Sequence, residues 1–432
     1  MTLPFLLCIL TLLFLAGVGA PISLAMIVSA VAYLALKGQD LSLAAEQMIQ
    51  GLYDSFVLLA VPLFIVAANI MNAGTISDRL LGFCVALVGR FRGGLGHVNV
   101  VASLIFSGMS GSAVADAAGI GKIIIEMMTR ERRYPSGYAA AITAASSTIG
   151  PIIPPSIPMV LYALISDSSI GYLFLGGILP GLLMGLVLMI MNARAARVRG
   201  FPVGKPYPMR EMPRVTLRAF PALLMPVILL YGIYGGVTTP TEAAAVAAAY
   251  ALILAALFYR ALSFRNLYAI LSESARSSAS VGLVIGGALI FNYIVASENV
   301  PTAIAAELSG LNLSPLVFLF VVNVILLLLG CLLDASTIIL VILPLFIPSC
   351  RALGIDLVHF GVVAVVNCMI GLITPPYGML LFVINATTGI PLRTIIKEIW
   401  PFIGVLIAAL VLMILFPEIV LWLPRQFGYV AS

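Results

Sequence analysis

Apolar runs long enough to cross a lipid bilayer recur along the whole chain, separated by short polar stretches. A helix needs about 20 predominantly apolar residues to span the hydrocarbon core. Uninterrupted runs lie near 3–16, 54–74, 170–193, 219–234, 278–296 and 398–422, and proline-broken runs lie near 20–36, 136–166, 240–259 and 357–388. The pattern predicts an all-α polytopic membrane protein. Segments 41–53 and 264–277 are amphipathic and too polar to span, so both are expected to be separate interfacial helices.

The second half of the chain repeats landmarks of the first half in the same order. "IGPIIPPSIPM" at 149–159 resembles "IGLITPPYGM" at 370–379, and their proline pairs are 221 residues apart. "GAPIS" at 19–23 and "TTPTE" at 238–242 show nearly the same spacing. Between these landmarks, each half has a stretch of small residues with one acid, Asp116 or Asp334. Matches in one order at nearly one spacing predict an internal duplication.

The duplication divides the chain into two repeats, residues 1–200 and 219–432, joined by a linker at 201–218. Each repeat is expected to contain a re-entrant helical hairpin and a broken transmembrane helix. The hairpins are placed at 94–128 and 313–350, and the broken helices at 136–166 and 357–388. If each hairpin enters and leaves by one face, each repeat crosses the membrane five times. An odd number of crossings gives the two repeats inverted topologies.

Composition and charge agree with a membrane protein. The 432 residues are 62% hydrophobic and 9% charged, and the mean hydropathy is +1.17. The net charge of +5 comes from basic residues in short loops rather than from a basic-aromatic patch, so no nucleic acid is expected. Segment 194–218 carries seven Lys and Arg against the single Glu211, which predicts a cytoplasmic location. Lys37 and Arg351 are exceptions, because this scheme places them on the side of the membrane opposite to the cytoplasm.

Several kinds of chemistry are excluded. The two histidines are isolated from each other, and the five cysteines lie in apolar surroundings without CxxC spacing, so buried structural thiols are expected rather than metal ligands or disulfides. No Walker sequence or Gly-rich phosphate loop is present, so ATP hydrolysis is not expected. Any transport by such a chain would be driven by an ion gradient or by the gradient of the substrate.

The broken helices and hairpin tips are the candidate binding sites. A break inside the membrane frees backbone carbonyls that must find a partner, and monovalent cations bind carbonyl and hydroxyl oxygens. One predicted cation site comprises Ser107, Gly108, Ser110, Gly111, Ser112, Thr148, Gly150 and Pro154. The other comprises Gly330, Asp334, Thr337, Gly371, Thr374 and Pro375. The alternative for any one of these residues is close helix packing or a simple proline kink.

Acidic residues in the apolar runs have two possible roles. A carboxylate in the membrane is costly and is a functional candidate by default. Asp116 and Asp334 either coordinate cations or cap a hairpin helix by accepting backbone N–H bonds. Glu242 follows Pro240 and Thr241, so a capping role at the start of a helix is expected there.

At these residues the sequence resembles the large membrane subunit of the tripartite ATP-independent periplasmic (TRAP) transporters. The matching stretches are "SGSAVADAAGIG", "SSTIGPIIPPSIPMVLYA", "GGVTTPTEAAAVAAAYAL", "LLDASTIILVILPL" and "GLITPPYGMLLFV". The resemblance implies a multi-pass protein of the bacterial inner membrane with an elevator-type fold, which is not an enzyme. It also implies Na⁺-coupled import of an organic acid, such as a C4-dicarboxylate or sugar acid, with no organic cofactor.

The resemblance also implies partners. A periplasmic substrate-binding protein would deliver the substrate, and a small four-helix membrane subunit would be a separate chain, because the duplicated unit occupies the 432 residues. The substrate is expected near the hairpin tip and the half-helix N-termini, which attract anions. The residues expected in its vicinity are Ser112, Asp116, Pro155, Ser156, Pro376 and Tyr377.

Two other functions remain open from the sequence. One is a self-sufficient Na⁺- or H⁺-coupled carboxylate carrier that needs no binding protein. The other is an intramembrane aspartyl protease, since two intramembrane aspartates are present. That protease chemistry requires a Gly-x-Gly-Asp setting, which neither "AVAD" nor "CLLD" supplies.

Overall fold

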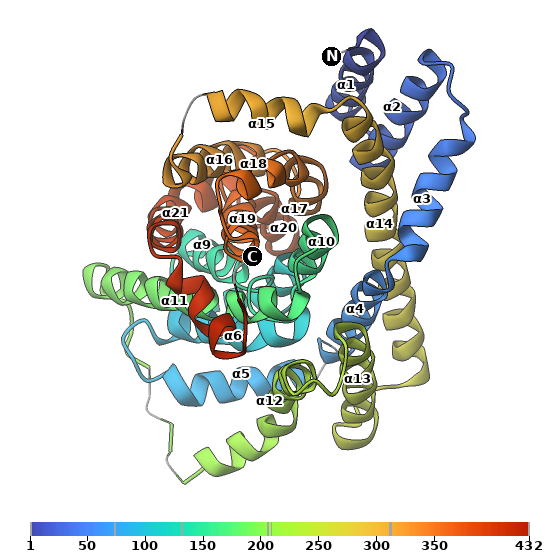
Figure 1. Ribbon diagram of the computed structural model, residues 1–432. Helices are drawn as coiled ribbons and strands as arrows, with labels where there is room; N and C mark the ends of the chain where they lie inside the picture. The colour runs from blue at the N-terminus through green and yellow to red at the C-terminus, as the bar shows by residue number, and fades with distance from the viewer. Residues whose placement is uncertain are drawn as a thin grey trace.

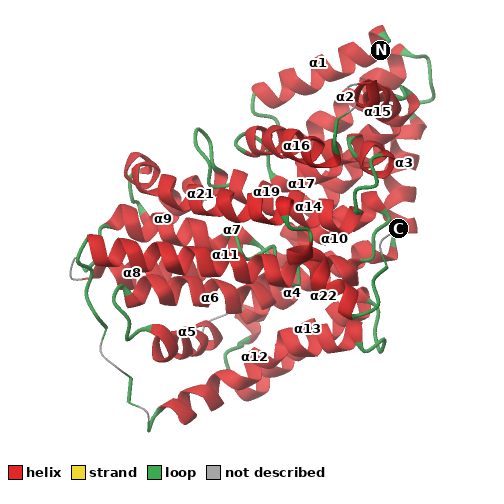
Figure 2. Ribbon diagram, turned by 60° about the vertical axis from the view of Figure 1, so that its left-hand side comes forward, coloured by secondary structure: helices red, strands yellow, loops and turns green. Residues whose placement is uncertain are grey.

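The computed structural model describes residues 2–72, 75–130, 133–204, 207–208, 210–310 and 313–430. Every regular element among them is helical, as Figure 2 shows, and the one extended pairing in these ranges is an isolated bridge between Arg92 and Val203. The all-α prediction is therefore confirmed.

The first half contains α1 (Leu3–Gly17), α2 (Ile22–Leu36), α3 (Ser42–Asp54), a 3₁₀ turn (Phe56–Leu59), α4 (Ala60–Met71), α5 (Thr75–Val88), α6 (Gly94–Ser110), α7 (Ala113–Asp116), a π segment (Ala117–Gly121), α8 (Lys122–Thr129), α9 (Ser136–Ser147), α10 (Ile157–Ser166) and α11 (Ile170–Val198).

The second half contains α12 (Met212–Tyr234), α13 (Pro240–Ile253) with a π segment (Leu254–Phe258), α14 (Phe264–Ser297), α15 (Val300–Gly310), α16 (Pro315–Gly330), α17 (Ala335–Thr337), a π segment (Ile338–Ile342), a 3₁₀ turn (Leu343–Leu345), α18 (Ile347–Ala352), α19 (Leu357–Gly371), α20 (Met379–Thr388), α21 (Leu392–Leu415) and α22 (Glu418–Gln426).

Both predicted hairpins and both predicted breaks lie at corresponding places in this order. The tip of the first hairpin separates α6 from α7, and that of the second separates α16 from α17. The returning arm of each hairpin contains a π segment, at Ala117–Gly121 and Ile338–Ile342, again 221 residues apart. Each break carries a cis peptide bond between its paired prolines.

The helices form two groups that lie side by side in Figure 1. We call α6–α11 with α16–α22 the central bundle, and α1–α4 with α12–α14 the frame. Within the bundle, α9 packs on α21, α16 on α19 and α11 on α6, α21 and α22. Within the frame, α4 packs on α13, and α14 packs on α2, α3 and α4. The candidate sites all belong to the bundle.

One prediction about the interfacial helices is wrong. The segment 264–277 is not a separate helix, because it continues without a break through α14. Its counterpart α3 is separate, with a bend of 75° before residues 56–71. The helix breaks at Ser55, whose backbone (φ −98°, ψ 86°) is not helical, and Pro62 lies further on, in the first turn of α4. The position in α14 that corresponds to Pro62 is Leu283, and that helix is continuous there.

Helix starts follow the capping rules. Thr239 and Glu242 form a reciprocal capping box at the start of α13, so the predicted role of Glu242 is confirmed. Ser314 caps α16 directly before Pro315. The sequence did not reveal α5, α15 or α22 as separate helices.

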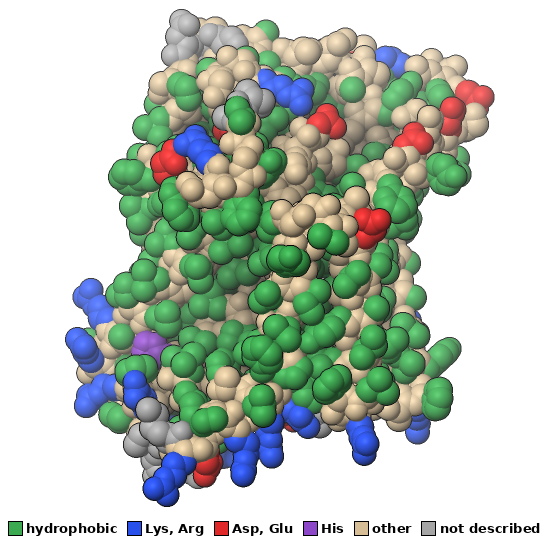
Figure 3. Space-filling model, turned by 60° about the horizontal axis from the view of Figure 1, so that its bottom comes forward, with side chains coloured by type: hydrophobic (Ala, Val, Ile, Leu, Met, Phe, Trp, Pro, Cys, Tyr) green, Lys and Arg blue, Asp and Glu red, His purple; other side chains and the backbone are tan. Residues whose placement is uncertain are grey.

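By length and composition, five described helices can cross a membrane, or six if α3 and the bent segment 56–71 form one span. Shorter apolar helices include α6 and α16 of the hairpins and α10, α19 and α20 of the broken helices. Figure 3 shows Lys and Arg side chains along the lower edge, whereas most visible Asp and Glu side chains lie near the upper edge. The charge scheme placed Lys37 on the side of the membrane opposite to most basic residues. Its ammonium group forms an ion pair of 2.7 Å with Glu298. Lys205 of the basic linker lies outside the described residues.

Candidate functional site

The tip of the first hairpin touches the break of the first broken helix. Gly111 has a left-handed backbone (φ 59°), and a Cβ added there would lie 2.6 Å from the carbonyl oxygen of Pro155. A Cβ on Gly108 would lie 3.8 Å from the carbonyl oxygen of Pro154. No hydrogen bond reaches either carbonyl from the described part of the chain. Glycine is therefore needed at position 111 so that the hairpin tip can approach the unpaired oxygen of Pro155, whereas the Gly108 distance is an ordinary contact.

Asp116 is the unusual residue of this first site. Its side chain is buried, with 5% exposure, and neither carboxyl oxygen has a hydrogen-bond partner among the described residues. Gly150 of the break lies against it, because a Cβ there would be 2.4 Å from Oδ2. The capping alternative does not apply to Asp116, since Ser112 caps α7 by accepting from the N–H of Ala115 at 3.4 Å.

The other predicted residues of the first site are buried, except for Ser112, which is half-buried. The hydroxyls of Ser107 and Thr148 donate to the carbonyls of Leu104 and Ala145, both at 2.6 Å. Their oxygens keep lone pairs that can face a cation. Ser110 is buried and its hydroxyl accepts from the N–H of Ser112 at 3.5 Å.

Ser156 marks the start of the second half of the broken helix. Its hydroxyl caps α10 by accepting from the N–H of Met159 at 3.2 Å, and it donates to the carbonyl of Pro151. The positive end of α10 is therefore held beside the break.

A stripe of glycines on α11, which the sequence analysis missed, holds the first break in place. A Cβ on Gly177 would lie 2.2 Å from the carbonyl oxygen of Ile152, and one on Gly181 would lie 2.4 Å from Ile153. Gly185 lies against Leu104 of α6 in the same way. The four-residue spacing is the signal for close helix approach in membranes.

At the second site, the end of α16 packs closely on the end of α19. Gly330 ends α16 and Gly371 ends α19, and a Cβ added to Gly371 would lie 2.7 Å from the Cα of Gly330. Asp334 is the N-cap of α17: its Oδ2 accepts from the N–H of Thr337 at 3.1 Å, and its Oδ1 accepts from the Thr337 hydroxyl. Both oxygens of Asp334 therefore have partners, in contrast to Asp116.

The break of the second site is more open than that of the first. Thr374 is buried, and its hydroxyl donates to the carbonyl of Ile370 at 2.7 Å. Pro375 is half-buried, whereas Pro376 and Tyr377 are exposed. The corresponding Pro154, Pro155 and Ser156 of the first break are buried. The Tyr377 ring, 52% exposed, lies 5.0 Å from that of Phe382.

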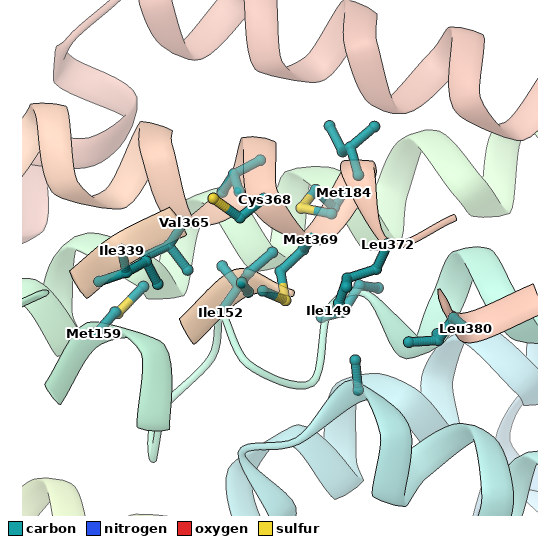
Figure 4. Close-up of a cluster of buried hydrophobic side chains, with 14 of the residues drawn as sticks. Ile149, Ile152, Met159, Met184, Ile339, Val365, Cys368, Met369, Leu372 and Leu380 are labelled. Atoms are coloured by element: carbon teal, nitrogen blue, oxygen red, sulfur yellow. The ribbon is translucent and has the colours of Figure 1, made fainter. Parts of the chain in front are cut away.

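An apolar cluster fills the space between the two breaks. Figure 4 shows Ile149 and Ile152 of the first break near Met369 and Leu372 at the end of α19. Each half-helix after a break packs against the hairpin of the other half. The helix α10 contacts the π segment Ile338–Ile342, and α20 contacts the π segment Ala117–Gly121. The two sites therefore share one rigid core.

Buried amides brace both hairpins, and the sequence analysis did not single them out. Asn99 on α6 donates to the Thr143 hydroxyl at 2.6 Å and accepts from Ser146 at 3.1 Å. In the second half, Asn367 donates to the side-chain oxygen of Asn323 at 2.7 Å. In the sequence, single asparagines within apolar runs were the signal that could have predicted these buried hydrogen bonds.

Metal ligation by side chains has no support in the described ranges, where no group of three or more His, Cys, Asp or Glu converges. The five cysteines are all free and buried, as predicted. The chemistry that the two sites can offer is oxygen coordination of a hard cation and attraction of anions by helix N-termini.

Comparison with known proteins assigns the family. The family model "Tripartite ATP-independent periplasmic transporter, DctM component" matches residues 7–419. The chain belongs to this family. It is therefore a transport permease subunit of the inner membrane and not an enzyme, which removes the protease alternative.

Two relatives from other bacteria are similar over most of their lengths. The sialic acid TRAP transporter large permease protein SiaM of Vibrio cholerae is 42% identical over 413 residues, covering 95% of this chain and 96% of that protein. The C4-dicarboxylate TRAP transporter large permease protein DctM of Pseudomonas aeruginosa is 40% identical, covering 87% and 88%.

A solved structure shares the fold. The YdaH transporter of Alcanivorax borkumensis aligns with a TM-score of 0.60 over 88% of each chain, at 16% sequence identity. At this identity the likeness concerns the fold alone.

Proposed function

We propose that this chain is the large membrane subunit of a Na⁺-coupled importer of an organic acid, which receives its substrate from a periplasmic binding protein. The observation that carries the coupling proposal is the buried, unpaired carboxylate of Asp116. A carboxylate in the membrane without a partner is costly, and a cation is the partner that the surrounding oxygens would accept.

The first cation site is proposed around Asp116. The unpaired carbonyls of Pro154 and Pro155 and the hydroxyls of Ser107 and Thr148 lie on the same hairpin and break. Oxygen ligands of this kind fit Na⁺. The second cation site is proposed at Asp334, Thr337 and Thr374 with the carbonyls of Gly330, Gly371 and Pro375, and there the cation would compete with existing hydrogen bonds.

The same carboxylate gives a physical reason for coupling. An organic acid near Ser112, Ser156 and the N-terminus of α10 would be repelled by an ionised Asp116. A bound Na⁺ neutralises that charge, so cation and anion each strengthen the binding of the other. Pro155, Pro376 and Tyr377 complete the proposed substrate vicinity.

The substrate class rests on the relatives. Their names record sialic acid, C4-dicarboxylate and 2,3-diketo-L-gulonate as substrates at 36–42% identity. All three are carboxylates, whereas the name of another relative, 38% identical, records isethionate, which is a sulfonate, so the proposed substrate is an organic acid, with a carboxylate as the commonest case.

The proposed mechanism is an elevator built from two inverted repeats, in which the bundle slides against the frame. Few hydrogen bonds join the two groups among the described residues. Asn292 of α14 donates to the carbonyl of Leu340 at 2.8 Å, and Tyr234 of α12 donates to that of Gly171 at 2.8 Å. Each such bond contributes about 1 kcal/mol, which is a small barrier to sliding.

The proposed partners are the periplasmic binding protein and a small four-helix membrane subunit. The sialic acid TRAP transporter permease SiaT of Haemophilus influenzae matches 96% of this chain over 68% of its own length, so it contains further residues that this chain does not match. A separate small subunit would supply the corresponding part.

The test is uptake into proteoliposomes that contain the chain with its small subunit, with and without the binding protein and a Na⁺ gradient. Uptake of a carboxylate is expected only when both are supplied. Uptake that is unchanged without Na⁺ would remove the coupling proposal. Uptake without a binding protein would favour the self-sufficient carrier.

A further inference from the structure

A cavity on the basic edge of the molecule lies outside both sites. It has a volume of about 360 Å³ and is enclosed by the end of α5, the loop before α6 and the last turns of α11. Its lining residues are Val88, Phe91, Arg92, His97, Met189, Ala193 and Arg197. The lining is therefore mostly apolar, with the two arginines Arg92 and Arg197 at its border.

The two arginines of this cavity have no ion-pair partner among the described residues. Nearby Arg199 differs, because it pairs with Glu398 at 2.7 Å. Arg92 and Arg197 are exposed and converge from segments more than 100 residues apart in the chain. Two arginines that line one cavity with no carboxylate among its lining residues favour a phosphate-like anion, which accepts several N–H bonds from guanidinium groups.

The apolar lining of the cavity adjoins a surface suited to acyl chains. Met189, Ala193 and Arg197 are spaced four residues apart and lie on one face of α11. The neighbouring face carries Leu182, Leu186 and Ile190, all exposed large apolar residues. On a membrane-spanning helix, this stripe faces the hydrocarbon chains and ends at the basic cavity.

We propose that this cavity binds one anionic phospholipid of the cytoplasmic leaflet. The phosphate would lie between Arg92 and Arg197, and an acyl chain would follow the stripe of α11. Basic pockets between membrane helices on the cytoplasmic side are suited to such headgroups. Because the cavity joins α5 to the hairpin helix α6, a bound lipid would link the bundle to the membrane surface.

The test compares two double variants with equal charge changes. Arg92→Gln with Arg197→Gln removes the cavity charges, whereas Arg214→Gln with Arg218→Gln removes two exposed arginines of α12 that do not line it. The chain, co-purified with its small membrane subunit and delipidated, is titrated with phosphatidylglycerol, and bound lipid is counted by native mass spectrometry.

We expect saturable binding of one phosphatidylglycerol to the wild type. The cavity double variant should weaken it about tenfold or more, because two charge-assisted bonds are lost. The α12 double variant should bind like the wild type. Equal weakening in both variants, or none in the cavity variant, would overturn the proposal.

Two further arms identify the ligand. Phosphatidylcholine should bind weakly, and equal binding of both lipids would contradict recognition of an anionic lipid. An excess of inorganic phosphate should leave phosphatidylglycerol bound. Its complete displacement would show that the site recognises a free phosphate and would overturn the assignment to a lipid.

Discussion

Asp116 and Asp334 lie on the returning hairpin arms of the two halves, about one helical turn apart in register, and their carboxylates have opposite surroundings. Asp334 accepts two hydrogen bonds from Thr337, whereas Asp116 is buried with no partner in the described residues. Gly150 of the break lies against the Asp116 carboxylate, whereas in the second half the glycines of the hairpin and the break, Gly330 and Gly371, lie against each other. The cap position of this arm holds Ser112 in the first half and Asp334 in the second, so Asp334 stabilises a helix start whereas Asp116, one turn further along, has no cap to make.

The largest expected effect is that of Asp116→Asn. In Na⁺-free buffer the variant should be at least as stable as the wild type, because it removes an unpaired buried charge. Added Na⁺ should raise the melting temperature of the wild type by more than that of the variant, in which only the second proposed site can bind the ion. Na⁺ affinity in uptake should fall about tenfold or more.

Asp334→Asn is the matched control. Asparagine caps a helix about as well as aspartate, so the stability without Na⁺ should change little. The loss of Na⁺ affinity should be smaller than for Asp116→Asn, because the oxygens of Asp334 already have partners. A larger loss at Asp334 would reverse the comparison.

The second prediction concerns the contact between hairpin tip and break. Gly111→Ala should strongly reduce Na⁺-driven uptake, because its methyl group would lie 2.6 Å from the Pro155 carbonyl. The left-handed backbone adds a cost of about 1–2 kcal/mol. Gly236 has a similar φ of 66° but no atom within 4 Å, so Gly236→Ala should bear only the backbone cost. Equal uptake by both variants would contradict a functional contact at the tip.

The hairpins and the broken helices could be located from the sequence, because prolines, glycines and single acidic residues interrupt an apolar pattern visibly. It left the roles of the two acids open, although the local signal was present. Ser112 stands at the cap position four residues before Asp116, while Asp334 stands three residues before Thr337. A cap needs a free first-turn N–H, so only the second arrangement makes the aspartate a cap.

Other features depend on contacts that no local pattern encodes. The polar segment 264–277 resembles an interfacial helix by composition, but packing on α2, α3 and α4 accompanies one continuous α14. The convergence of Arg92 with Arg197, and of Lys37 with Glu298, joins residues far apart in sequence. Such pairs follow from the tertiary arrangement alone.

The third prediction tests how the hairpins are held by the frame. The second hairpin accepts a hydrogen bond from Asn292 through Leu340, whereas the first meets the frame where Gly108 packs on Pro226. Asn292→Ala should change the turnover rate by up to about fivefold, the equivalent of one hydrogen bond of about 1 kcal/mol. Proteoliposome uptake at saturating substrate measures this rate.

Asn69→Ala is the control for Asn292→Ala. Asn69 donates to Ser274 at 2.9 Å within the frame, so its loss removes a bond of similar kind without touching a hairpin. Both variants should lower the melting temperature, but only Asn292→Ala should alter turnover. Equal changes in turnover would show that the bond to Leu340 has no special part in movement of the bundle.

The smallest effect is expected at Glu298, an acid outside the membrane-spanning helices that has the partners Asp116 lacks. Lys37, Tyr33 and Thr2 donate to its carboxylate at 2.7, 2.7 and 2.8 Å. Chiefly through the bond from Lys37, they lower its pKa from 4.5 to about 2.

Because the folded-state pKa of Glu298 is below the unfolded value, its stabilisation is complete above pH 4.5 and is lost as the pH falls toward 2. Melting temperatures from pH 7 to pH 3 should therefore show Glu298→Gln below the wild type at neutral pH, with the difference shrinking in acid. Glu46→Gln, which removes an exposed carboxylate, should match the wild type throughout. A difference for Glu298→Gln that is constant with pH would show that lost packing, and not the charge, causes the effect.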